Sequence, residues 1–154
     1  MNARIAGIAV VLAFACGCRQ SPSTLVTSGY DEQEMNAAIA KAREQTDVFL
    51  AELAKPTGSG HAVKVLIQEG EEGEQIWITP VKFRDGIFEG EIGNEPGHLK
   101  TVKLGDKWTA KKDEITDWMY MRNGKIQGNF TLRPLLKNMP PEQAAKARAM
   151  LEDP

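Results

Sequence analysis

Residues 114–132, EITDWMYMRNGKIQGNFTL, contain the strongest fold signal of the chain. The dipeptide Asn123-Gly124 separates two runs rich in β-branched, aromatic and other apolar residues, and this arrangement is the most specific short signature of a β-hairpin. Successive side chains of a strand point to opposite faces of a sheet, so Asp117 and Trp118 face opposite sides. The stretch therefore predicts an antiparallel hairpin with one strand on each side of Asn123-Gly124.

Further short strands are predicted upstream of this hairpin. Each run is rich in Val, Ile, Phe or Trp and is bounded by turn residues, and Arg84-Asp85-Gly86 predicts a tight turn. Glycines within and beside the runs indicate bulges and sharp corners in a curved sheet. The predicted strands span residues 62–67, 75–83, 87–90, 107–110, 114–121 and 125–132.

A long helix is predicted before the strands. Apolar residues from Met35 to Leu53 recur at steps of three and four, which places them on one face of a helix of about six turns that ends before Pro56. Asp31, followed three residues later by Glu34, is typical of a helix N-cap. The single apolar stripe predicts that this helix packs against the sheet.

Length and composition fit one domain of the α+β class. A chain of 154 residues with 42% apolar and 26% charged residues can bury a core, which excludes a disordered chain or a coiled coil. A short C-terminal helix is predicted after Pro140-Pro141. We therefore expect a long N-terminal helix on a curved antiparallel sheet, or a partly open small barrel, of five or six strands. The net charge of −2 gives no basic field to attract nucleic acid, so no nucleic-acid partner is expected.

The N-terminus has the pattern of a bacterial lipoprotein signal. Arg4 precedes the uncharged apolar run 5–14, and both cysteines of the chain, Cys16 and Cys18, follow it. The run is about half the roughly 20 residues of a membrane-spanning helix. Residues 1–17 are thus the predicted signal peptide, and Cys18 is the predicted acylated residue, with Cys16 as the alternative.

The predicted signal implies export and a lipid anchor. Residues 18–30 are rich in Ser, Thr, Pro and Gly and predict a flexible tether, so the folded domain should span 31–154. Acyl chains on the cysteine would hold the protein at a membrane. Neither cysteine is followed by aspartate, which, by resemblance to enterobacterial lipoproteins, favours the periplasmic face of the outer membrane.

No catalytic or metal-binding signature is present in the sequence. It has no nucleophile elbow, no zinc-protease motif and no phosphate-binding loop, and its two histidines have no second ligand at a fixed short spacing. The acidic residues of 69–74 match no calcium loop. We therefore expect no cofactor, no metal and no catalytic residue, and the chain is more consistent with a non-enzyme.

A binding module for an envelope protein or a cell-wall ligand is the leading functional hypothesis. Tryptophans on predicted strands can form an aromatic platform, although core packing is their more frequent use. The candidate contact residues lie on predicted strands, in the turn Asn94–Gly97 and at the end of the last strand. They are Trp77, Asn94, Asp117, Trp118 and Arg133.

Three alternatives stay open. A hydrolase would need Asp117 together with a second carboxylate, Glu74 or Glu91, brought near it by folding. An aspartate beside a tryptophan in a curved sheet more often binds a backbone amide or an arginine, and Arg133 is a candidate for that arginine. An inhibitor or immunity-type lipoprotein, or a spacer domain without a ligand, would need no reactive group.

Several segments resemble the YegJ-like family of uncharacterised bacterial domains. The resemblance runs from about Met35 to Leu136, and its most specific parts are Asp117-Trp118-Met119 and Thr131-Leu132-Arg133. It also includes EQIW (74–77), GEIGNEP (90–96), KLGD (103–106) and GNFTLR (128–133). The family usually has a histidine where this chain has Gln75, so no role of that histidine is transferred. The resemblance implies a single folded domain and no established activity, substrate or cofactor.

Overall fold

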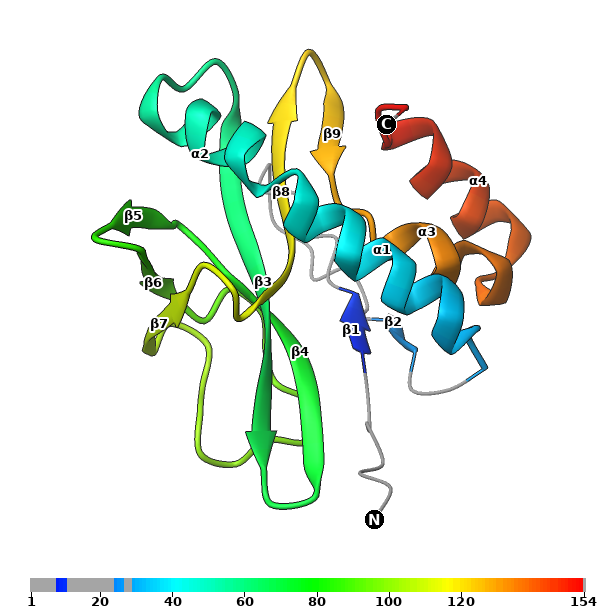
Figure 1. Cartoon of the computed structure of the whole chain (residues 1–154). Coiled ribbons are helices and arrows are strands. Elements are labelled where there is room, and N and C mark those ends of the chain that lie inside the picture. The colour runs from blue at the N-terminus through cyan, green and yellow to red at the C-terminus, as the bar shows by residue number, and fades with distance from the viewer. Residues whose placement is uncertain (1–7, 11–23, 27–28, 154) are drawn as a thin grey trace.

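The computed structural model describes residues 8–10, 24–26 and 29–153 and confirms the α+β class (Figure 1). The helices are α1 (Glu32–Glu44), α2 (Thr46–Ala54), α3 (Leu132–Leu135) and α4 (Pro141–Met150), with a short 3-10 helix η1 (Leu136–Asn138) after α3. The strands are β1 (Ile8–Val10), β2 (Thr24–Val26), β3 (Ser59–Glu69), β4 (Glu72–Ile78), β5 (Lys82–Arg84), β6 (Ile87–Glu91), β7 (Lys107–Lys111), β8 (Ile115–Arg122) and β9 (Lys125–Gly128).

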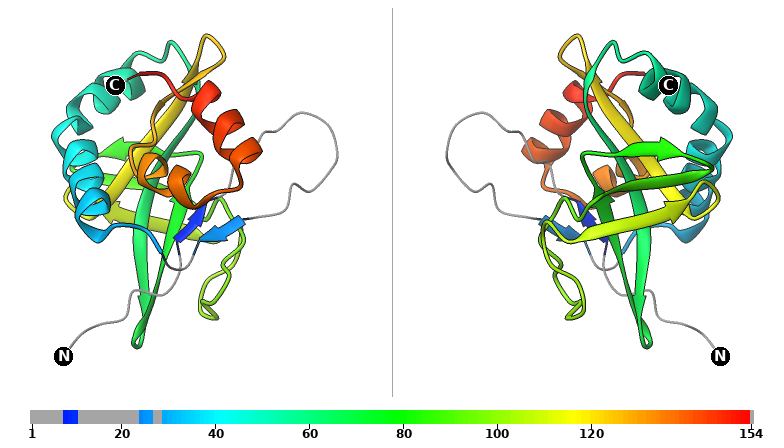
Figure 2. Two further views of the ribbon diagram at one scale, coloured as in Figure 1. Left: turned by 90° about the vertical axis from the view of Figure 1, so that its right-hand side faces the viewer. Right: turned by 90° about the vertical axis from the view of Figure 1, so that its left-hand side faces the viewer.

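The strands form two sheets that do not close into a barrel within the described residues. The larger sheet has the order β2-β1-β4-β3-β8-β9, and the smaller has the order β5-β6-β7. The predicted strand 75–83 is divided between them, because β4 ends at Ile78 and β5 starts at Lys82. Pro80 lies in the gap and has no N–H group to continue a ladder. Figure 2 shows the β3–β4 hairpin projecting away from the helices.

The two N-terminal strands fall in the segments predicted as signal peptide and tether. β1 pairs antiparallel with β2 and meets β4 in parallel at Ile8 and Gln75. Cys16 and Cys18 lie outside the described residues. The signal peptide, its acylation site and the tether therefore stay predictions.

The predicted N-terminal helix is interrupted at Gln45, which separates α1 from α2. The Ala42 carbonyl, which would accept the backbone bond at this point of a continuous helix, accepts instead from Trp118 Nε1 at 2.8 Å and from Thr46 Oγ1 at 3.2 Å. A side chain that enters the helical hydrogen-bond ladder bends or breaks it. Trp118 of β8 thus fixes where the helix changes direction.

Trp118→Phe should destabilise the protein by about 1–3 kcal/mol, because it removes the bond to the Ala42 carbonyl and leaves part of the indole volume empty. Urea unfolding followed by circular dichroism measures the change. Trp108→Phe is the matched control, since Trp108 is only partly buried and its indole has no hydrogen bond within the described residues. Equal losses in both variants would contradict a special role of Trp118.

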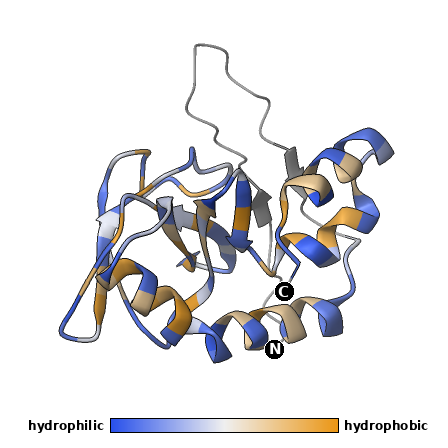
Figure 3. Cartoon of the chain, turned by 90° about the horizontal axis from the view of Figure 1, so that it is seen from above, coloured by the Kyte–Doolittle hydropathy of each residue, from blue (hydrophilic) through white to orange (hydrophobic). Residues whose placement is uncertain are grey.

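Two apolar cores lie on opposite sides of β8. The first joins α1 and α2 to both sheets and contains Phe49, Trp118, Tyr120 and Phe88. The second joins the start of α1 to β9, α3 and α4. Figure 3 shows the mixture of hydrophilic and hydrophobic residues along α1 and α2 that lets each cover a core with one side. Because α1 contributes to both cores, it holds the two halves of the domain together.

The last predicted strand, 125–132, is shorter than expected and continues as a helix. β9 ends at Gly128, where φ is +76°, and Asn129 follows with a φ of +49°. A Cβ on Gly128 would lie 2.3 Å from the Trp118 carbonyl oxygen, so only glycine fits there. The chain then turns into α3, whose N-cap is Thr131.

Candidate functional site

Four of the five predicted contact residues lie in the interior. The exposed fractions are 3% for Trp77, 2% for Asn94, 0% for Asp117 and 3% for Trp118. Arg133 is partly exposed at the start of α3. The side chains of Asn94, Asp117 and Trp118 form hydrogen bonds within the fold, and Trp77 is buried, so these four residues offer no free surface to a ligand.

Asp117 organises the turn between β9 and α3. Its Oδ1 accepts from Trp118 N at 2.9 Å and Phe130 N at 3.1 Å, and its Oδ2 accepts from Thr131 N at 2.8 Å and Thr131 Oγ1 at 2.6 Å. Buried carboxylates require such partners. The expectation that this aspartate binds backbone amides therefore matches the geometry of the site.

A buried lysine lies beside Asp117 and Thr131. Lys64 of β3 is 1% exposed, donates to Thr131 Oγ1 at 2.6 Å and lies 4.4 Å from the centre of the Trp77 ring. It pairs across the sheet with Asp117 on one side and Trp77 on the other. Burial lowers the pKa of Lys64 to about 8, and the charge of Asp117 opposes part of that shift. We call Lys64, Trp77, Asp117 and Thr131 the buried polar cluster.

Asn94 binds β4 beyond the point where β1 pairs with that strand. Its Oδ1 accepts from Trp77 N at 2.8 Å, and Gly93 N donates to the Trp77 carbonyl at 2.7 Å. These bonds satisfy groups that a further strand would otherwise bind. The loop after β6 thus covers this part of β4, and Asn94 stabilises the fold by binding the Trp77 backbone.

Arg133 does not form the expected ion pair with Asp117. Its guanidinium donates to the Gly128 carbonyl at 2.8 Å, the Asn129 carbonyl at 3.1 Å and the Glu152 carbonyl at 2.8 Å. Burial lowers the pKa of Arg133, and the nearby Asp117 acts in the opposite direction. Arg133 therefore joins the end of β9 to the C-terminal residues.

The carboxylates considered for hydrolysis do not form a pair. Glu74 is fully buried and accepts from Gly97 N and His98 N. Cross-strand pairing puts Lys64 opposite both Trp77 and Asp117, so Asp117 lies on the Trp77 face, and Glu74 lies on the other face. Glu91 belongs to the smaller sheet and forms an ion pair with Lys107. The geometry therefore gives no support to the hydrolase.

A third internal carboxylate fixes the end of α2. Glu52 accepts from Gly58 N at 2.8 Å, from both Thr57 N and Thr57 Oγ1, and from the His61 ring at 3.1 Å. Burial acts to raise the pKa of Glu52, but these hydrogen bonds outweigh it and lower the pKa to about 2. His61 also stacks on Tyr120, with ring centres 5.5 Å apart. This histidine therefore has structural partners.

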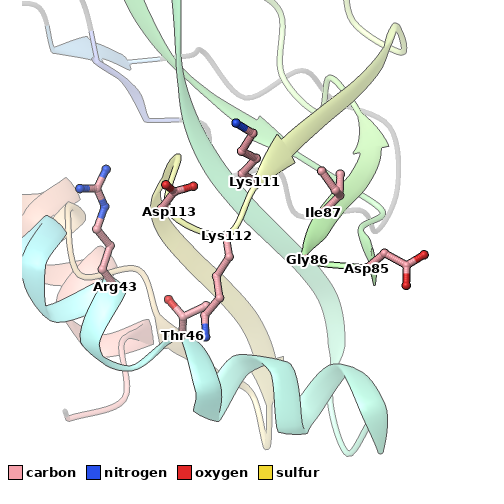
Figure 4. Close-up of a pocket in the computed structure, with 8 residues that line it drawn as sticks. All are labelled: Arg43, Thr46, Asp85, Gly86, Ile87, Lys111, Lys112 and Asp113. Atoms are coloured by element: carbon pink, nitrogen blue, oxygen red, sulfur yellow. The ribbon is translucent and has the colours of Figure 1, made fainter.

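A charged cleft lies where the helix break faces the smaller sheet (Figure 4). It has a volume of about 580 Å³ and is lined by side chains from the junction of α1 and α2, the β5–β6 turn and the β7–β8 turn. Lys112 N donates to the Gly86 carbonyl at 3.2 Å, which ties the two turns together. The residues of this cleft, which we call the junction cleft, are Arg43, Thr46, Asp85, Gly86, Ile87, Lys111, Lys112 and Asp113.

Two cations of the junction cleft have no acidic partner within the described residues. Arg43 donates through Nε to the Ile115 carbonyl at 2.9 Å, and neither its terminal nitrogens nor Lys111 Nζ takes part in an ion pair. Lys112, by contrast, binds Asp47 at 2.6 Å. The cleft thus contains the Arg43 guanidinium, which the Ile115 carbonyl holds in place, and the Lys111 ammonium group, which has no ion-pair partner among the described residues.

Sequence reasoning missed the junction cleft. Residues 111–114, KKDE, are consecutive charged residues, a pattern that usually marks a solvated turn. Nothing in the local sequence indicates that this turn faces Arg43, which is 68 positions away from Lys111 in the chain (111 − 43). Arg43 and Thr46, which flank the helix break at Gln45, both line the cleft, and Trp118 binds the Ala42 carbonyl at that break.

The described residues contain neither a cluster of metal-ligating side chains nor a long apolar helix. No group of three or more His, Cys, Asp or Glu side chains in this part of the chain is arranged to hold a metal ion. No helix in the same residues combines the length and the apolar character needed to cross a membrane.

Comparisons with known proteins place the chain in a family. The DUF2314 family, described as an uncharacterized protein conserved in bacteria, matches residues 32–150. The uncharacterized protein YegJ of Escherichia coli K12 is 42% identical over 135 residues, which cover 88% of each chain. A putative ankyrin repeat protein of Neisseria meningitidis serogroup B is 38% identical over 86 residues, 53% of this chain and 34% of that protein. No solved structure matches. The match over most of the domain confirms the resemblance seen in the sequence, and the chain belongs to the DUF2314 family of uncharacterized bacterial proteins.

Proposed function

We propose that this protein is an exported, lipid-anchored binding module that holds a protein or cell-wall ligand in the junction cleft. The observation that carries the proposal is that Arg43 and Lys111, two cations without an acidic partner among the described residues, line the same cleft of about 580 Å³. Ligand sites are typically clefts of roughly 300–1,000 Å³ with a few convergent polar groups.

The use of the other polar groups supports a binding role over an enzymatic one. Asp117, Glu74 and Glu52 are buried and bind backbone amides, so they contribute to folding. General acid–base chemistry needs a titratable group within reach of a substrate. The junction cleft has two exposed carboxylates, Asp85 and Asp113. Figure 4 shows Asp85 pointing away from the other charged groups, so the two do not form an acid–base pair in the cleft.

Photo-crosslinking in intact cells tests the proposal. A photoreactive residue at Ile87, inside the junction cleft, should give a discrete crosslinked product, and Arg43→Gln with Lys111→Gln should abolish it. The matched control is the same residue at Leu104, which is 56% exposed and lies outside the cleft. Equal products from both positions, or none from Ile87, would contradict the proposal and favour a spacer domain.

Metabolic labelling with a palmitate analogue tests the anchor separately. The wild-type protein should incorporate the label, Cys18→Ala should lose at least about nine-tenths of it, and Cys16→Ala should keep it, because one cysteine becomes the acylated N-terminus. Gel fluorescence of membrane fractions gives the readout. Retention of the label in Cys18→Ala together with its loss in Cys16→Ala would show that Cys16 is the acylated residue. No label in the wild-type protein would refute the lipid anchor.

A further inference from the structure

The geometry points to a carboxylate as the group that the junction cleft recognises, presented by a peptide-sized ligand. This inference rests on the proposed function and specifies its chemistry. It starts from the charged residues that line the cleft, which come from the junction of α1 and α2, the β5–β6 turn and the β7–β8 turn (Figure 4).

Only part of the charge around the cleft is free to bind a ligand. Lys112 is neutralised by Asp47, and Asp85 points away from the other lining residues. Arg43, Lys111 and Asp113 are left, and in Figure 4 the Asp113 carboxylate lies between the other two side chains. These three groups carry a net charge of +1, which complements one negative charge.

The negative charge of Asp113 distinguishes between anions. A phosphate monoester carries about −1.5 to −2 charges near pH 7, so the net charge of +1 at these three groups would leave part of its charge uncompensated. A carboxylate ligand carries a single charge and matches the planar donor fork of an arginine. The cleft is therefore better suited to a carboxylate than to a phosphate.

Arg43 is held ready for such a ligand. Its Nε is already bound to the Ile115 carbonyl at 2.9 Å, which restricts the side chain while its terminal nitrogens have no ion-pair partner among the described residues. A donor that is restrained before binding loses less conformational entropy when the ligand arrives. The volume of about 580 Å³ exceeds that of one carboxylate and leaves room for attached residues beside Ile87.

NMR titration of the ¹⁵N-labelled full-length protein in detergent tests the inference with three probes: N-acetyl-alanyl-alanine, its C-terminal amide and inorganic phosphate. The free acid should shift the amide signals of Gly86 and of residues 111–113. The C-terminal amide and phosphate should each bind at least about tenfold more weakly. Arg43→Gln with Lys111→Gln should also weaken the acid about tenfold or more, whereas Lys107→Gln, on the same strand but outside the cleft, should not.

Each contrary result has a defined meaning. Equal binding of acid and amide in the cleft would overturn the carboxylate and leave the proposed binding function standing. Tighter binding of phosphate would replace the carboxylate with a phosphate. No shift at these residues with any probe would overturn the inference, and crosslinking from Ile87 would then decide separately whether the cleft binds anything.

Discussion

Asp117→Asn should remove most of the stability of the domain, with an expected loss of about 3–5 kcal/mol. Asp117 is fully buried and accepts four hydrogen bonds, two on each oxygen. An amide presents a donor where one of these oxygens accepted two bonds, so it leaves buried N–H or O–H groups unsatisfied. It also removes the negative charge opposite Lys64. Because small domains are stable by only about 5–15 kcal/mol, many molecules should be unfolded at 37 °C.

Urea unfolding followed by tryptophan fluorescence measures this loss. Asp106→Asn is the matched control, because Asp106 is exposed and its side chain accepts a single backbone bond, from Lys103 N. The control should change the free energy of unfolding by less than about 1 kcal/mol. A folded Asp117→Asn protein of unchanged stability that no longer crosslinks through Ile87 would show that Asp117 serves a ligand instead of the fold.

The sequence was informative wherever local patterns determine structure. The hairpin at Asn123-Gly124 and the turn at Asp85-Gly86 form where predicted, because backbone with positive φ favours Asn, Asp and Gly. The N-cap at Asp31 also forms, with a bond from Glu34 N at 3.0 Å. These features depend on a few adjacent residues, so no tertiary information is needed to find them.

Features set by distant contacts could not be predicted. The apolar stripe of the first helix continues through Gln45, but the Trp118 side chain, 73 positions later (118 − 45), donates to the Ala42 carbonyl where the helix is interrupted. The division of the strands into two sheets and the position of KKDE (111–114) opposite Arg43 likewise depend on tertiary packing. For the same reason, the residues selected as contacts from the sequence, such as Trp77 and Asp117, belong to the interior.

The free energy of unfolding should rise between pH 8 and pH 9.5 because of Lys64. Burial lowers the pKa of this lysine in the folded protein from 10.5 to about 8. Above pH 8 the folded protein loses this proton while the unfolded chain keeps it, so the unfolded state binds more protons and stability increases with pH. Each pH unit contributes at most about 1.4 kcal/mol, which gives about 2 kcal/mol over the interval.

Urea unfolding at intervals between pH 7 and pH 9.5 measures the slope, and Lys64→Met is the matched variant. Subtracting its curve removes the contributions of all other groups, including the cysteines. The range stops below pH 10 because burial raises the pKa of Tyr30 and Tyr120, and such tyrosines lower stability when the unfolded chain ionises first. Parallel curves for the two proteins would mean that Lys64 keeps its proton at pH 9.5. In that case Asp117, paired with Lys64 across the sheet, would have to hold the charge more strongly than burial disfavours it.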